Sequence, residues 1–146
     1  MSLASIQPCL SVINFTFPGP PVAAVRMTRA SMWRPQAQNY IGYRNALADK
    51  LRAQYPDWQV GKPPTVAKER TKWIKEQKRY FYRLGVSAYV ESDRADWDNL
   101  YKSAADSIQC AGLIWNDRLI EESLGGVRKI DKENPRLEIT LERVLR

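Results

Sequence analysis

The chain has 146 residues, of which 44% are hydrophobic, and it carries a net charge of +7. These values predict a single domain that can bury a substantial core and that has an anionic partner, with nucleic acid the leading candidate. The complete absence of histidine excludes serine–histidine and cysteine–histidine nucleophile pairs and histidine-based zinc sites.

The N-terminal segment does not have the pattern of a signal peptide, because it lacks a basic residue before Arg26 and is interrupted by Pro8 and Asn14. No apolar run approaches the ~18 residues of a membrane span. Two isolated cysteines, Cys9 and Cys110, predict packed thiols in a reducing compartment. We therefore expect a cytoplasmic protein.

Alternating side chains over residues 11–17 predict the first strand. The segment 22–35 has no clear periodicity and is expected to be an irregular basic loop. Its candidate DNA-binding residues are Arg26, Arg29 and Arg34. Apolar residues recur at helical spacing over residues 36–54 and predict the first helix.

A second helix is predicted over residues 65–84, after a proline-rich linker. One side of this helix would carry five basic residues that are candidates for binding DNA: Lys68, Lys72, Lys75, Arg79 and Arg83. Like charges one turn apart destabilise an isolated helix, which favours a polyanionic partner for this basic stripe. The alternative is an ordinary solvated helix face.

The remaining elements complete the order β-α-α-β-α-β-β. We expect a strand at 86–91, a third helix at 97–111, a strand over 119–130 that is broken at Gly125-Gly126, and a last strand in RLEITLERVL. This order predicts an α+β domain with one mixed β-sheet on which the helices pack.

Negative charge is concentrated between the fourth and fifth of these elements, at Asp93, Asp96 and Asp98. Carboxylates this close repel one another, so a cation or a helix N-terminus has to offset their charge. In an extended segment Asp96 and Asp98 share one side, whereas a helix separates them by ~200°. Asp98 could instead act as the N-cap of the third helix.

Lys102 follows Asp98 by one helical turn, and Asp117 lies at the next turn of the chain. Their structural alternatives are a surface ion pair and an ordinary turn residue. A set of carboxylates without histidine suits Mg²⁺, which prefers oxygen ligands. In a basic surface this set predicts phosphodiester hydrolysis by metal-bound water, with Lys102 stabilising the developing charge.

Three segments, RADWDNLYKSAADSI, GLIWNDRLIEE and RLEITLE, follow the opening FTFPGPP. Together they resemble the RusA-type Holliday junction resolvases, which are small, dimeric, Mg²⁺-dependent endonucleases often carried by phages or prophages. The family pattern D-x-D-N-L-x-K with a later aspartate is matched by Asp96, Asp98, Asn99, Leu100, Lys102 and Asp117. The resemblance covers residues 12–22 and about 86–142.

The resemblance implies that Asp96, Asp98 and Asp117 bind the metal and that Lys102 is the catalytic lysine. Asn99 would support the site through a hydrogen bond. The cofactor would be Mg²⁺, for which Mn²⁺ can substitute, and the partner would be branched DNA, chiefly four-way junctions, bound by a homodimer. Asn116 is a departure from the family pattern, because some relatives carry a second acidic residue at this position.

The resemblance further implies a single endonuclease domain over residues 1–146, with a basic helical insertion at about 61–85. Its expected function is to resolve Holliday junctions by paired symmetric nicks in recombination and repair. Two alternatives remain open. One is a non-catalytic nucleic-acid-binding protein of the same fold, and the other is a structural protein whose aspartates only cap a helix.

Overall fold

The computed structural model describes residues 9–146, so residues 1–8 of the expected domain lie outside it. The elements in chain order are β1 (Cys9–Pro18), α1 (Pro35–Gln54), η2 (Pro56–Trp58), α2 (Ala67–Gln77), β2 (Tyr80–Val90), α3 (Trp97–Cys110), η3 (Asp117–Leu119), β3 (Ile120–Gly125), β4 (Arg128–Ile130) and β5 (Arg136–Leu145). The predicted α+β class with one mixed sheet is confirmed. No helix in the described range is long and apolar enough to cross a membrane.

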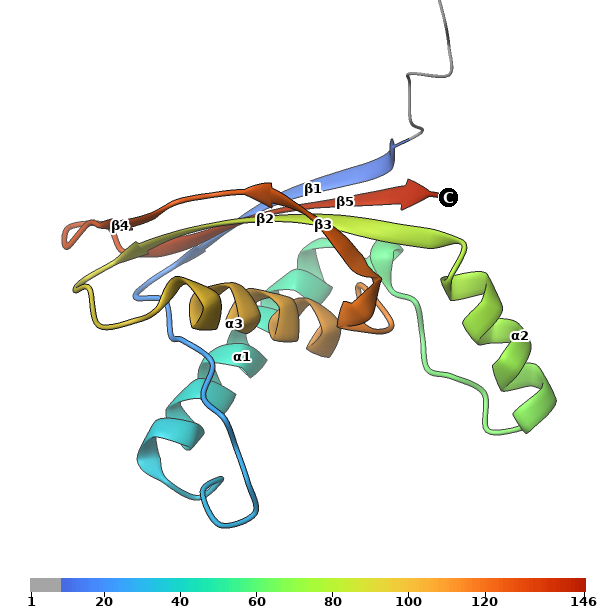
Figure 1. Ribbon diagram of the computed structural model, residues 1–146, viewed down its shortest axis with the longest axis horizontal. Helices are drawn as coiled ribbons and strands as arrows, with labels where there is room; N and C mark the ends of the chain where they lie inside the picture. Colours follow the sequence, from blue (N-terminus) through green and yellow to red (C-terminus); the bar gives the residue numbers. More distant parts are fainter. Residues whose placement is uncertain (1–8) are drawn as a thin grey trace, which may run out of the picture.

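The sheet has the strand order β1-β5-β2-β3, and β4 pairs with β2 as well. β5 runs antiparallel to both of its neighbours, whereas β3 and β4 run parallel to β2. Helices α1 and α3 lie under one face of the sheet, and no helix formed by residues 9–146 covers the other (Figure 1). The predicted alternation of β5 is confirmed, because Leu137, Ile139 and Leu141 are buried on the helical side.

Helix α3 is fixed to the sheet by the apolar face that its sequence predicts. Leu100, Ala104 and Ile108 recur every fourth residue and are completely buried. Helix α1 packs against α3 and contributes the buried residues Tyr40 and Leu47 to the same core. The polar side of α3 therefore faces away from the sheet.

The predicted second helix is wrong over its last seven residues, 78–84. Helix α2 ends at Gln77, and Tyr80 already belongs to β2, where it pairs with Leu145. The run of aromatic residues at 80–82 fits a helical and a strand period equally well, and pairing with β5 decides the outcome. The strand expected at 86–91 consequently begins six residues earlier.

The predicted strand break at Gly125-Gly126 is confirmed and has a steric cause. Gly126 has a φ of +143°, and a Cβ atom added to it would lie 1.7 Å from the carbonyl oxygen of Val86 in β2. Only glycine allows both this φ and this close approach of backbone to backbone. Residue 126 therefore lets the chain pass from β3 to β4 along the same edge of β2.

We predict that Gly126→Ala lowers the free energy of unfolding by more than about 1 kcal/mol, because both the φ and the close approach exclude a side chain. Gly42→Ala is the matched control, since a Cβ at this exposed position in α1 meets nothing within 4 Å. The control should be neutral or stabilising by up to about 1 kcal/mol. Urea denaturation measures both, and equal stabilities of the two variants would contradict this account.

Candidate active site

The aspartate-rich junction is fixed by a residue from β4, the short strand that pairs with the end of β2. Arg128 in β4 donates hydrogen bonds from Nη1 to the carbonyl oxygens of Ala95, at 2.9 Å, and Asp93, at 3.2 Å. Asp96, which follows Ala95, has an extended backbone and occupies the N-cap position of α3. Asp98 is the second residue of the helix, so its predicted role as the N-cap is wrong, and the side chain of Asp96 makes no capping hydrogen bond either.

Both carboxylates at this junction are exposed, and neither Asp96 nor Asp98 forms an ion pair with any residue between 9 and 146. The positive N-terminal end of α3 favours negative charge here and offsets part of their repulsion. The predicted alternative of a pair between Lys102 and Asp98 is wrong, because Lys102 Nζ lies 3.5 Å from Asp106 Oδ1 instead. Both aspartates are thus available to a ligand.

The predicted irregular loop 22–35 lies beside this junction. The N–H group of Ala24 donates a 2.9 Å hydrogen bond to the carbonyl oxygen of Asn99 and thereby docks the loop on the first turn of α3. A hollow between loop and helix is lined by both Arg26 and Asp96. The exposed side chains farther along the loop include Arg29, Trp33 and Arg34. Trp33 is 76% exposed, and sequence analysis missed it.

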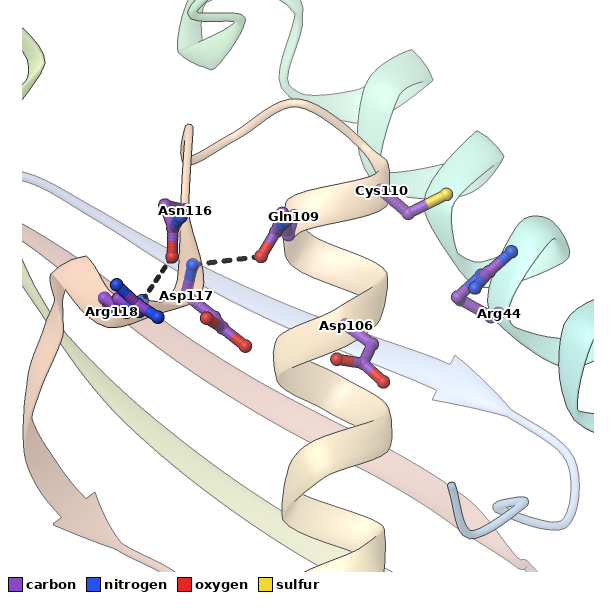
Figure 2. Close-up of a pocket in the computed structure, with 7 residues that line it drawn as sticks. All are labelled: Arg44, Asp106, Gln109, Cys110, Asn116, Asp117 and Arg118. Carbon is purple, nitrogen blue, oxygen red and sulfur yellow. Dashed lines mark hydrogen bonds between the residues drawn. The ribbon is translucent and has the colours of Figure 1, made fainter. Parts of the chain in front are cut away.

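Asp117 begins η3, close to the C-terminal end of α3. Its N–H group donates a 2.9 Å hydrogen bond to Gln109 Oε1, and Asn116 Oδ1 accepts one of 2.9 Å from the N–H group of Arg118 (Figure 2). Asn116 thus uses its side chain to cap η3. This amide holds the turn that presents Asp117.

Figure 2 shows Asp106 and Asp117 pointing into one hollow, from α3 and from η3. Its remaining lining comes from Arg44, Gln109, Cys110, Asn116 and Arg118. Cys110 is exposed, so the predicted packing of this thiol is wrong, and the side chain of Cys9 lies outside the described residues.

Sequence analysis missed Asp106, although its spacing carried a signal. It lies one turn after Lys102 and two turns after Asp98, so the three share one side of α3. Tyr40 Oη donates a 2.6 Å hydrogen bond to Asp106 Oδ2. Burial, followed by this hydrogen bond to the carboxylate, raises the pKa of Tyr40 far above its usual value, so the phenol stays protonated.

The structure does not bring the three predicted metal ligands together within one chain. At a rise of about 1.5 Å per residue, Gln109, which holds Asp117, lies about 16 Å along α3 from Asp98. Among the described residues, no group of three or more acidic or cysteine side chains lies close enough to hold a metal ion. Asp96 and Asp98 stand at one end of α3 and Asp117 at the other.

The predicted basic stripe is divided between two elements. Arg79 lies beyond the end of α2 and pairs with Glu76, while Arg83 in β2 pairs with Glu122 and Glu142. Only three residues of the stripe lie on α2, where they are exposed and have no acidic partner within residues 9–146: Lys68, Lys72 and Lys75.

Helix α2 has no buried residue and stands at the side of the body, apart from α1 and α3 (Figure 1). Its Trp73 packs edge-on against Trp115, with ring centroids 5.7 Å apart. Trp115 immediately precedes the turn of Asn116 and Asp117. The lysine-bearing helix is therefore in contact with the segment that presents Asp117.

The family model for endodeoxyribonuclease RusA matches residues 18–142 of the chain. No curated protein gives a significant sequence match. Members of this family are nucleases that act on branched DNA junctions and in general require a metal ion. Since the match covers most of the chain, including the three helices, strands β2 to β4 and all the aspartates described above, the chain belongs to the RusA family of endodeoxyribonucleases.

Proposed function

We propose that the protein is a Mg²⁺-dependent endodeoxyribonuclease that resolves four-way DNA junctions by paired symmetric nicks. The observation that carries this proposal is the pair of exposed carboxylates, Asp96 and Asp98, at a helix N-terminus beside a basic loop. Mg²⁺ usually binds through one or two carboxylates together with waters and substrate phosphates. An open pair of this kind fits that chemistry.

In this proposal Asp96, Asp98 and Asp117 hold Mg²⁺, and Mn²⁺ can take its place. Once bound, the ion would lower the pKa of a water molecule and polarise the phosphate. Lys102, whose side chain is 61% exposed, offers its ammonium group to the charge that develops on the phosphate. Asn99 shares a hollow with Asp96 and supports the site by a hydrogen bond to the DNA backbone.

The separation of the aspartates along α3 supports a homodimeric site. We propose that Asp96 and Asp98 of one subunit are completed by Asp117 of the partner subunit. A two-fold axis then generates two equal sites, which match the two symmetric nicks. A chain acting alone leaves each end of α3 with an incomplete set of ligands.

Two groups of exposed basic residues are proposed to bind the DNA backbone. One is the loop that lies beside Asp96 and contains Arg26, Arg29 and Arg34. The other is the lysine face of α2, which consists of Lys68, Lys72 and Lys75. We interpret α2 with its flanking linkers as an insertion in one endonuclease domain. Arg79 and Arg83 are engaged in ion pairs and are better explained by stability of the fold.

Asp96→Asn should abolish Mg²⁺-dependent nicking of a synthetic four-way junction and leave junction binding intact or tighter. An amide is a poorer Mg²⁺ ligand, and loss of a negative charge favours DNA. Asp93→Asn is the matched control, because Asp93 is an exposed neighbour to which we assign no role in the site. Cleavage by Asp96→Asn within a few-fold of wild type would refute the assignment.

The same assay distinguishes the proposal from the alternative of a non-catalytic nucleic-acid-binding protein. Wild-type protein that binds the junction but leaves every strand intact in the presence of Mg²⁺ or Mn²⁺ would favour that alternative. Linear duplex of the same sequence is the control for selectivity.

Replacing Lys68, Lys72 and Lys75 together by Gln should weaken binding to DNA of every shape. The salt dependence of binding should flatten by roughly one unit of slope for each phosphate that the variant no longer neutralises. Turnover at saturating protein should stay near that of wild type, and the triple Lys→Arg variant should keep the wild-type slope. An unchanged slope in the Gln variant would mean that this helix face is only solvated.

Light scattering should detect a dimer of the wild-type protein in solution or on junction DNA, because the proposed site requires two copies. The Asp117→Asn variant serves as the control and should also form a dimer, since it alters the site without removing the surrounding turn. A stable monomer in both conditions would contradict the homodimer.

A further inference from the structure

The buried hydroxyl of Tyr40 holds an acidic residue on the exposed side of α3. Tyr40 belongs to α1 and is 1% exposed, and its Oη atom donates a 2.6 Å hydrogen bond to Asp106 Oδ2. The second oxygen of the same carboxylate lies 3.5 Å from Lys102 Nζ. One carboxylate thus joins a fixed residue of the core to an exposed lysine.

An isolated ion pair on a helix surface would not by itself hold Lys102 in one position. Such pairs contribute almost nothing to stability, because both side chains remain mobile and solvated. Asp106 differs from this case, because a hydrogen bond to a carboxylate is stronger than one between neutral groups and because its donor, Tyr40, is packed in the interior. Burial and the hydrogen bond to Asp106 raise the pKa of Tyr40, so the phenol remains a donor at neutral pH.

The geometry points to Asp106 as a positioning residue, which Tyr40 anchors and which in turn holds the Lys102 ammonium group on the polar side of α3. Lys102 then meets the DNA phosphate from a restricted set of rotamers, and less of its side-chain entropy is lost in the transition state. This inference rests on the proposed function, because it gives Lys102 the role stated above.

Tyr40→Phe tests the anchor by removing one hydroxyl group. Single-turnover cleavage of a four-way junction at saturating protein and Mg²⁺ should fall by ~2–10-fold, as expected for the removal of one hydrogen bond. Junction affinity should change by less than about twofold, because Lys102 keeps its charge. Asp106→Asn, which keeps an acceptor for Tyr40 but loses the charge, provides a second variant and should show a similar loss.

Tyr43→Phe is the matched control, because Tyr43 lies in the same helix and its buried hydroxyl has no hydrogen-bond partner within residues 9–146. Its cleavage rate and melting temperature should equal or exceed those of wild type. Tyr40→Phe as active as Tyr43→Phe would overturn the inference and leave the proposed function standing.

A double-mutant cycle with Lys102→Ala separates positioning from a general loss of stability. If Tyr40 and Asp106 act through Lys102, adding Tyr40→Phe to Lys102→Ala lowers the cleavage rate no further. The same loss in both backgrounds would overturn the inference alone. An inactive wild type would refute the proposed function and this inference with it. A fully active Lys102→Ala variant would refute the role of Lys102 and this inference, and would leave the nuclease activity standing.

Discussion

Burial of one face of the sheet is the constraint on which the rest of the structure depends. β5 lies between β1 and β2, and its apolar side chains form a surface that α1 and α3 cover. Because Leu100, Ala104 and Ile108 must face that surface, the opposite side of α3 has to face solvent. That side carries Asp98 and Lys102, and Asp106 lies at its border with α1, where it is 25% exposed.

Each end of α3 then receives polar groups from a different part of the chain. At the start of the helix, Arg128 holds the preceding turn and Ala24 docks the basic loop, so positive charge lies near Asp96. At the other end, Gln109 holds Asp117. The chain is basic overall, yet Asp96, Asp98 and Asp117 have no ion-pair partner in the described range, whereas Asp106 pairs with Lys102. Unpaired carboxylates beside basic residues contribute little to the stability of the fold, but they can bind a metal ion next to a DNA phosphate.

The sequence predicted those elements in which local pattern and tertiary structure agree. The face of α3 that contains Leu100 and Ile108 was found because its period is helical and its burial complete. The end of α2 was missed because residues 80–84 fit two periods, and only pairing with β5 distinguishes them. For the site, the sequence predicted which residues take part but not which of them lie close together. The contact of Tyr40 with Asp106 joins positions 66 residues apart, and no local pattern indicates it.

Mixed dimers test the central claim, that Asp96 and Asp98 of one subunit act with Asp117 of the other, most directly. Asp96→Asn and Asp117→Asn subunits are mixed, allowed to exchange and assayed on a four-way junction with Mg²⁺. The account predicts that each variant alone is inactive and that the mixture nicks one strand, because a mixed dimer contains one site with all its native carboxylates. A mixture as inactive as its components would contradict the account, because it would mean that each site is built from a single chain.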